Sequence, residues 1–202
     1  MFLRRFTQLQ LGLFLYGASL ALMVEAGLGL NPWSVFHQGL AEITGLSLGL
    51  IVNLVGALVL LVWIPLRQKP GLGTICNVLL IGTSADIVLW IIPPIEGLAL
   101  RIAFLVGAVV LNGAATGAYI GAGLGPGPRD GLTTGMVRLT GWPVRWVRMG
   151  IELAVLALGW MLGGAIGVGT VLYALTNGPL LQLFLPMFEI APEPSTGPAP
   201  AA

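Results

Sequence analysis

Charged residues are scarce in this sequence: only 8% of its 202 residues are Asp, Glu, Lys or Arg. A soluble domain carries roughly 25% charged residues because its outer surface faces water. A chain this short keeps a large outer surface after folding, so a bigger hydrophobic core does not explain the deficit. With 56% hydrophobic residues, the chain is expected to expose its surface to a lipid bilayer.

Other residues that support common functions are also rare. The single cysteine, Cys76, excludes a disulfide framework and a multi-thiol metal site. The single histidine, His37, offers no histidine cluster, and no nucleophile–base arrangement or phosphate-binding loop is present. The net charge of +1 argues against a nucleic-acid binder, which would show a basic face. We therefore expect no enzyme activity, no cofactor and no metal.

Six apolar stretches are long enough to cross the hydrocarbon, which takes about 20 residues in a helix. They are 6–24, 46–66, 72–92, 98–120, 144–162 and 168–188. Tryptophans gather near the ends of these stretches, as expected for side chains at a membrane interface. The sequence therefore predicts an all-α protein with six transmembrane helices.

Basic residues predict the orientation of these helices. If the N-terminus is cytoplasmic, eight of the nine Lys and Arg residues lie on or near the cytoplasmic side, and Arg101 alone lies outside. Such a bias is typical of helical membrane proteins. The prediction is a multi-pass protein of the cytoplasmic membrane with both termini inside the cell.

An internal repeat relates the two halves of the chain. Gly27-Leu28-Gly29 recurs as Gly123-Leu124-Gly125, 96 residues later. The same shift, without gaps, aligns glycines, prolines and threonines from Gly17 to Leu89 with the second half. We therefore predict one membrane domain over 1–189, with repeats at 6–92 and 98–188, followed by a disordered Pro/Ala-rich tail at 190–202.

Each repeat contains three predicted spans, so the second repeat enters the membrane from the opposite side. The halves are then inverted repeats, related by a two-fold axis in the membrane plane. This arrangement is common in secondary transporters, which bind their substrates at the interface between repeats. A duplicated membrane scaffold without transport is the alternative.

A segment rich in Gly and Pro follows the first span of each repeat. The segments are 27–34 (GLGLNPWS) and 123–131 (GLGPGPRDG), and each precedes an apolar stretch too short to span. Two structures fit this pattern. The short helices either re-enter the membrane and meet near its middle, or lie flat at opposite surfaces. In the first case their N-termini favour an anion.

These two segments resemble those of the YczE-type integral membrane proteins of bacteria, which are related to the broader YitT-like group. The resemblance covers nearly the whole chain apart from the tail, and the second segment is the more specific. It implies a bacterial cytoplasmic-membrane protein. It supplies neither a substrate nor functional residues, so the candidate site rests on the residues themselves.

Polar residues at membrane depth supply the candidate site, because charges there are costly and tend to be functional. The Gly-Pro segments contribute Asn31 and Ser34 toward the outer side and Arg129 and Asp130 toward the cytoplasmic side. Asp130 either caps its own helix or pairs with Arg129. Asp86, in the third span, is a candidate proton or cation site. Arg148 and Glu152, one turn apart, are interpreted as a structural ion pair.

Two functions remain open. The first is a small-solute transporter or exporter, and an anionic or polar substrate suits the candidate site. The second is a scaffold or regulator that binds another membrane protein. Expected partners are the bilayer, this solute and, as a further alternative, a second copy of the chain, but not nucleic acid.

The orientation can be tested by labelling thiols in a Cys76→Ala background. We expect cysteines introduced at position 3 or 195 to resist an impermeant reagent added outside intact cells, because both termini are cytoplasmic. A cysteine in the loop before Arg101 should react and serves as the control. Labelling of position 3 or 195 from outside would contradict the predicted orientation.

Overall fold

A computed structural model describes residues 1–190, and these residues form eight helices without strands. The helices are α1 (Phe2–Ala26), α2 (Pro32–Thr44), α3 (Leu48–Trp63), α4 (Leu72–Ile91), α5 (Leu98–Gly121), α6 (Pro128–Thr140), α7 (Val144–Met161) and α8 (Val168–Phe188). The expected all-α class is confirmed for this part of the chain. The predicted disordered tail begins at 190, and its residues 191–202 lie outside the described ones.

The helices repeat along the chain at the spacing seen in the sequence. The short helices α2 and α6 begin at Pro32 and Pro128 and end at Thr44 and Thr140, each pair 96 residues apart. A proline at the first helical position is favoured because its fixed φ suits a helix and its missing N–H leaves no donor unpaired. The two Gly-Pro segments therefore start equivalent short helices.

Length and charge limit how many helices qualify as membrane spans. Four of the described helices, α1, α4, α5 and α8, are long and apolar enough, and the pair α2 and α3, bent by 114°, gives at most a fifth. Helix α3 has only 16 residues, so it is about 24 Å long at 1.5 Å per residue. Helix α7 carries Arg145, Arg148 and Glu152 within 18 residues. The six-span topology thus remains a prediction.

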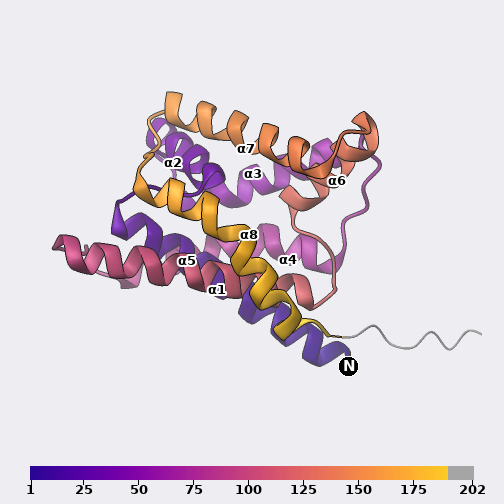
Figure 1. Cartoon of the computed structure of the whole chain (residues 1–202), viewed down its shortest axis with the longest axis horizontal. Helices are drawn as coiled ribbons and strands as arrows, with labels where there is room; N and C mark the ends of the chain where they lie inside the picture. The colour runs from indigo at the N-terminus through magenta and orange to yellow at the C-terminus, as the bar shows by residue number, and fades with distance from the viewer. Residues whose placement is uncertain (191–202) are drawn as a thin grey trace, which may run out of the picture.

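The helices form two layers (Figure 1). In one layer α1 packs against α4 and α5, and α5 packs against α8. In the other, α2 packs against α3 and α7, and α6 packs against α3 and α7. Contacts of α4 with α3 and α6 join the layers. The second layer thus interleaves helices from both halves of the chain, since α2 pairs with α7 and α6 with α3.

Reciprocal backbone hydrogen bonds connect the halves. The Gly73 N–H group donates to the Leu124 carbonyl and the Gly169 N–H group donates to the Leu28 carbonyl, both at 2.8 Å. Each bond joins the start of the last long helix in one half to the Gly-rich break in the other half. Equivalent bonds in the two directions are those expected from two halves related by a two-fold rotation.

Glycine is required in these breaks. Gly29 and Gly125 have φ values of 108° and 129°, a region that residues with a side chain rarely adopt. A Cβ atom on Gly29 would also collide with the backbone of Gly167, and one on Gly125 would press against Gly71. The breaks therefore lie directly against the starts of α8 and α4.

Small residues also allow α1 to cross α4 closely. Gly17 of α1 faces the backbone of α4, where a Cβ atom would collide with the Ile81 carbonyl and the Ser84 side chain. Leu13, Leu20 and Ala85 are fully buried around this crossing. Close approach of helix backbones through small residues is a common way to associate helices in membranes. Helix α1 is thereby the most buried of the long apolar helices.

Replacing Gly17 by alanine tests this crossing. Because a Cβ atom at Gly17 must push α4 away, we expect Gly17→Ala to lower the free energy of unfolding by about 1–3 kcal/mol. The matched control is Gly107→Ala on α5, where a Cβ atom meets open space. Alanine favours helix formation there, so the control should be neutral or slightly stabilising. Equal unfolding midpoints for both variants in mixed micelles would contradict the prediction.

Candidate functional site

A cavity of about 100 Å³ lies between the two layers and is lined by both Gly-Pro segments. We call it the central cavity. Asn31, Pro32 and Trp33 line it from the first segment, and Gly127 to Asp130 line it from the second. Helices α1, α3, α4, α5, α7 and α8 contribute the remaining walls. Its volume is sufficient for several water molecules.

The short helices start differently although their positions correspond. Asn31 caps α2, because its Oδ1 atom accepts a hydrogen bond of 2.9 Å from the Ser34 N–H group. Gly127 occupies the corresponding position in α6 and has no side chain to cap with. The first N–H groups of α6 therefore lack the side-chain partner that α2 has. Such groups attract negative charge.

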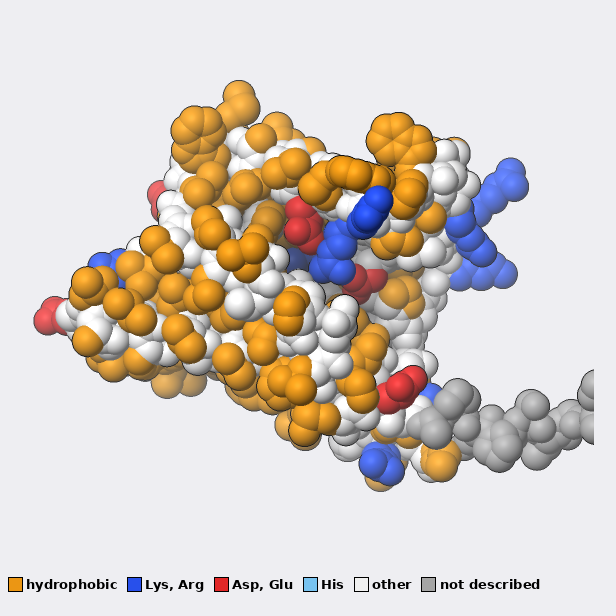
Figure 2. Space-filling model, in the orientation of Figure 1, with side chains coloured by type: hydrophobic (Ala, Val, Ile, Leu, Met, Phe, Trp, Pro, Cys, Tyr) orange, Lys and Arg blue, Asp and Glu red, His pale blue; other side chains and the backbone are white. Residues whose placement is uncertain are grey.

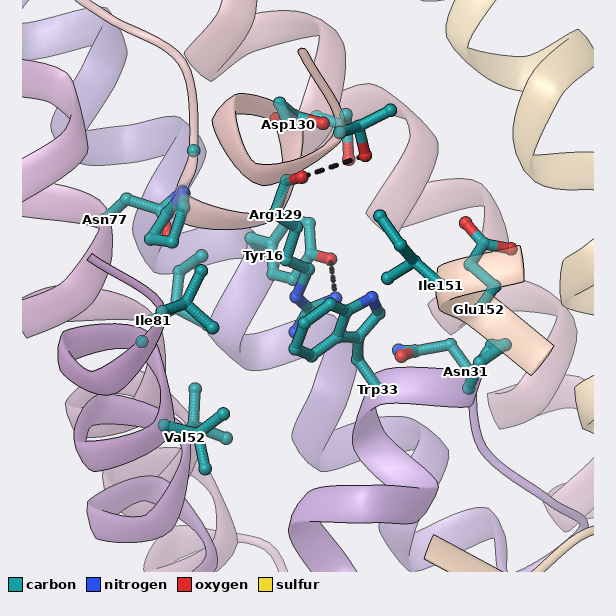
Figure 3. A pocket seen from close by; sticks show the side chains of 18 of the residues that line it. Tyr16, Asn31, Trp33, Val52, Asn77, Ile81, Arg129, Asp130, Ile151 and Glu152 are labelled. Carbon is teal, nitrogen blue, oxygen red and sulfur yellow. Dashed lines mark hydrogen bonds between the residues drawn. The ribbon is translucent and has the colours of Figure 1, made fainter. Parts of the chain in front are cut away.

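Arg129 and Trp33 meet inside the central cavity (Figure 3). The guanidinium carbon of Arg129 lies 5.0 Å from the centre of the Trp33 ring, and its Nη1 atom donates to the Tyr16 hydroxyl at 3.3 Å. Arg129 and Trp33 are 96 positions apart, so equivalent points of both segments are in contact. Segments on opposite membrane surfaces would lie about 30 Å apart. The geometry therefore agrees with short helices that meet.

Asp130 takes neither of the arrangements considered from the sequence. Its Oδ2 atom accepts a hydrogen bond of 2.9 Å from the Tyr119 hydroxyl, and no ion pair with Arg129 exists in the described part of the chain. Its place in the first turn of α6 still suits a negative charge. The neighbouring charges of Arg129 and Asp130 thus have separate, neutral partners.

The Arg148–Glu152 ion pair is confirmed, with 3.0 Å between Nε and Oε1. Both residues line the central cavity, which was not predicted from the sequence. Their side chains remain 47% and 33% exposed, so the pair is accessible from the cavity mouth. The pair is therefore part of the candidate site and also links two successive turns of α7.

Asp86 lies outside the central cavity. Its carboxylate accepts hydrogen bonds from the Ser47 hydroxyl at 2.6 Å and from the Gly49 N–H group at 2.7 Å. Ser47 is the N-cap of α3, so Asp86 satisfies and neutralises the start of that helix. This local role accounts for the carboxylate in α4 without a proton or cation site.

Ser34 also does not line the cavity, although it is buried and its hydroxyl oxygen has no hydrogen-bond partner among residues 1–190. His37, one turn further along α2, does line the cavity. It is only 2% exposed, and its Nδ1 atom has no partner within the same range. Of the five predicted residues, Asn31, Arg129 and Asp130 line the central cavity, whereas Ser34 and Asp86 do not.

The tyrosines of the site were not predicted from the sequence. Tyr16, Tyr119 and Tyr173 come from α1, α5 and α8, and all three line the cavity. A second polar cluster lies beside them: Asn112 donates to Ser19 at 2.8 Å and accepts from Tyr173 at 3.0 Å. Tyrosines in apolar helices carry no signal of their own. These tyrosines are recognised as part of the site only because the fold brings them close to the Gly-Pro segments.

Metal binding has no support in residues 1–190, where no group of three or more His, Cys, Asp or Glu side chains is placed to hold an ion. The available chemistry is instead one of separated charges and hydroxyl groups. Arg129 supplies positive charge, Asp130 supplies negative charge, and the tyrosines supply hydrogen bonds. Such a cavity suits binding of a polar molecule.

Comparison with known proteins gives the family. Residues 3–186 match the "Family of unknown function (DUF6198)". The "Uncharacterized membrane protein YczE" of Bacillus subtilis is 38% identical over 177 residues, which cover 87% of this chain and 82% of that protein. An "Uncharacterized protein" of Haemophilus influenzae is 38% identical over 173 residues, covering 86% of this chain and 79% of its own length.

A more distant relative is the "Uncharacterized protein YyaS" of Bacillus subtilis, 27% identical over 184 residues, which cover 89% of this chain and 91% of that protein. No solved structure matches. The resemblance to YczE seen in the two Gly-Pro segments is thus confirmed over most of the chain. The protein is a membrane protein that belongs to the DUF6198 family and is similar in sequence to YczE.

Proposed function

We propose that this protein transports small polar or anionic solutes across the bacterial cytoplasmic membrane. In this proposal α1, α3, α4, α5, α7 and α8 are six spans, and the halves are inverted repeats with both termini in the cytoplasm. The short helices α2 and α6 re-enter from opposite sides and meet at the central cavity. The solute binds there, at the interface between repeats.

The observation that carries the proposal is the meeting of Trp33 and Arg129 in one cavity. Broken helices and irregular backbone are tolerated at membrane depth only where they are buried in protein or line a polar cavity. A guanidinium group at that depth is costly, and such charges usually mark a substrate or ion pathway. The contact of Arg129 with the equivalent residue of the other repeat supports a position of this charge near the proposed axis between the halves.

The arrangement of layers supports a route for alternating access. Helices α2 and α7 pair across the halves, as do α6 and α3. Symmetry-related pairs of this kind allow one side of the cavity to close as the other opens, by rocking of one unit against the other. The reciprocal bonds at Gly73 and Gly169 lie at equivalent places in both halves. In the proposed movement, the two units rotate about these two points.

The shortness of α3 and the charges of α7 are both compatible with six spans. A 16-residue helix is about 6 Å shorter than a 30 Å hydrocarbon core, and a bilayer thins modestly around short spans. In α7 the three charges are Arg145 near the start and the Arg148–Glu152 pair, which faces the cavity.

Charge removal at the cavity tests the proposal. We expect purified wild-type protein to gain thermal stability from at least one member of a library of small carboxylates, phosphates and polar solutes, because a ligand stabilises the folded state it binds. Arg129→Gln should weaken that ligand by roughly tenfold to a hundredfold, since bonds to a charged group contribute about 1.5–3 kcal/mol. Asp130→Asn should also change the affinity.

The matched controls make the same kinds of charge change outside the cavity. Arg138 on α6 and Glu42 on α2 do not line the cavity. The variants Arg138→Gln and Glu42→Gln should therefore bind the ligand as wild type does. No stabilisation by any solute would favour the scaffold function instead. Binding that survives Arg129→Gln and Asp130→Asn but is lost in Asp86→Asn would move the site to α4.

A further inference from the structure

The two halves differ in how their last two helices pack. In the first half α3 packs against α4, but the corresponding helices α7 and α8 do not pack closely. Helix α8 contains Pro179, and Figure 1 shows this helix bent away from α7 along its second half. Proline inside a helix is a common cause of such bends. The central cavity therefore has a wall between α3 and α4 but an opening between α7 and α8.

Charged side chains lie in this opening. Figure 2 shows side chains of both signs gathered in a hollow between α7 and α8, with hydrophobic side chains on either side. Arg148 and Glu152 of α7 and Asn177 of α8 line the cavity here. Arg148 and Glu152 are the fifth and ninth of the 18 residues of α7, so the charged pair lies in the first half of a proposed span and reaches its middle at Glu152.

A partly exposed ion pair at that depth needs a polar neighbour. An opening between two spans faces the bilayer from the side, and acyl chains do not solvate charges. The cavity has a volume of only about 100 Å³, which suits a headgroup and not a whole lipid. Any longer apolar part of a ligand must therefore extend through the opening between α7 and α8.

We infer that the ligand is an amphiphile with a zwitterionic headgroup, which enters the central cavity sideways from the bilayer between α7 and α8. This inference rests on the proposed function and names the substrate class of the same site. The headgroup occupies the cavity, and the apolar chain lies against the hydrophobic flanks of the opening and continues into the lipid.

The charges of the cavity specify the headgroup. Arg129 and Arg148 balance Asp130 and Glu152, so a ligand of zero net charge with separated charges matches best. Within the described residues, the guanidinium of Arg129 donates to Tyr16 and stacks on Trp33, which leaves N–H groups for a phosphate beside the uncapped start of α6. Asp130 accepts a hydrogen bond from Tyr119, which leaves carboxylate lone pairs for an ammonium group.

Native mass spectrometry of the full chain in maltoside micelles tests this inference. The probes are phosphatidylethanolamine, which is zwitterionic, and phosphatidylglycerol, which is anionic, added in equal amounts. We expect wild-type protein to retain phosphatidylethanolamine about tenfold more strongly, because only this headgroup matches both Arg129 and Asp130. Arg129→Gln should lose both lipids, whereas Asp130→Asn should reverse the preference toward phosphatidylglycerol.

Controls on the same helices separate this effect from surface charge. Arg138→Gln and Glu42→Gln should keep the wild-type preference. The route is tested by Asn177→Trp, which fills the opening, against Leu175→Trp on the same helix, where the side chain is already 71% exposed. We expect only Asn177→Trp to lose the lipid. If a tryptophan variant fails to fold, the inference is still tested by Asp130→Asn, because a reversed lipid preference can only be observed in folded protein.

The outcomes distinguish this inference from the proposed function. If glycerophosphoethanolamine, the soluble headgroup, competes as well as the intact lipid binds, the apolar chain contributes nothing and the amphiphile is wrong, while a solute site remains. Equal retention of both lipids by wild type and all variants would overturn the inference alone. If small solutes also fail to stabilise the protein in an Arg129-dependent way, the proposed function fails with it.

Discussion

Two equivalent backbone hydrogen bonds hold the central part of this fold in place. The bond from Gly73 to Leu124 and the bond from Gly169 to Leu28 each join a Gly-rich break to the start of a long helix in the other half. Because both breaks lead directly into short helices, these bonds also fix where α2 and α6 begin. The meeting of Trp33 with Arg129 follows from them. A side chain at Gly29 or Gly125 would push against Gly167 or Gly71 in the other half and so disturb the cavity between the halves.

Duplication alone would give a symmetric cavity, and the chemistry comes from the positions where the copies differ. Asn31 caps α2 with its own side chain, whereas Gly127 leaves the start of α6 uncapped. Trp33 in the first segment corresponds to Arg129 in the second, so an aromatic ring in one half faces a cation in the other. One half thus supplies a neutral, capped helix start and the other supplies an uncapped start with a charged side chain, so the two helix starts at the cavity differ in chemistry.

Much of this fold was predictable from the sequence, because its strongest signals are local. Glycine and proline set the ends of α2 and α6, and the 96-residue shift is enough to show that these two helices correspond. The site was only partly predictable. Tyr16 and Tyr119 are ordinary residues of apolar helices, and they become part of the site because α1 and α5 pass beside the Gly-Pro segments. Contacts between residues about a hundred positions apart leave no pattern in a single sequence.

Asp86 and Asp130 show why a charge in a membrane protein is an ambiguous signal. Asp86 interrupts an apolar helix, Asp130 follows a Gly-Pro segment, and both carboxylates are expensive to place away from water. Asp86 accepts from the Ser47 hydroxyl and from the Gly49 N–H group at the start of α3, so its bonding needs are met within the fold. Asp130 has the Tyr119 hydroxyl and an adjoining cavity. A carboxylate already bound by its own fold stabilises structure, whereas one left with free lone pairs beside open space is available to a ligand.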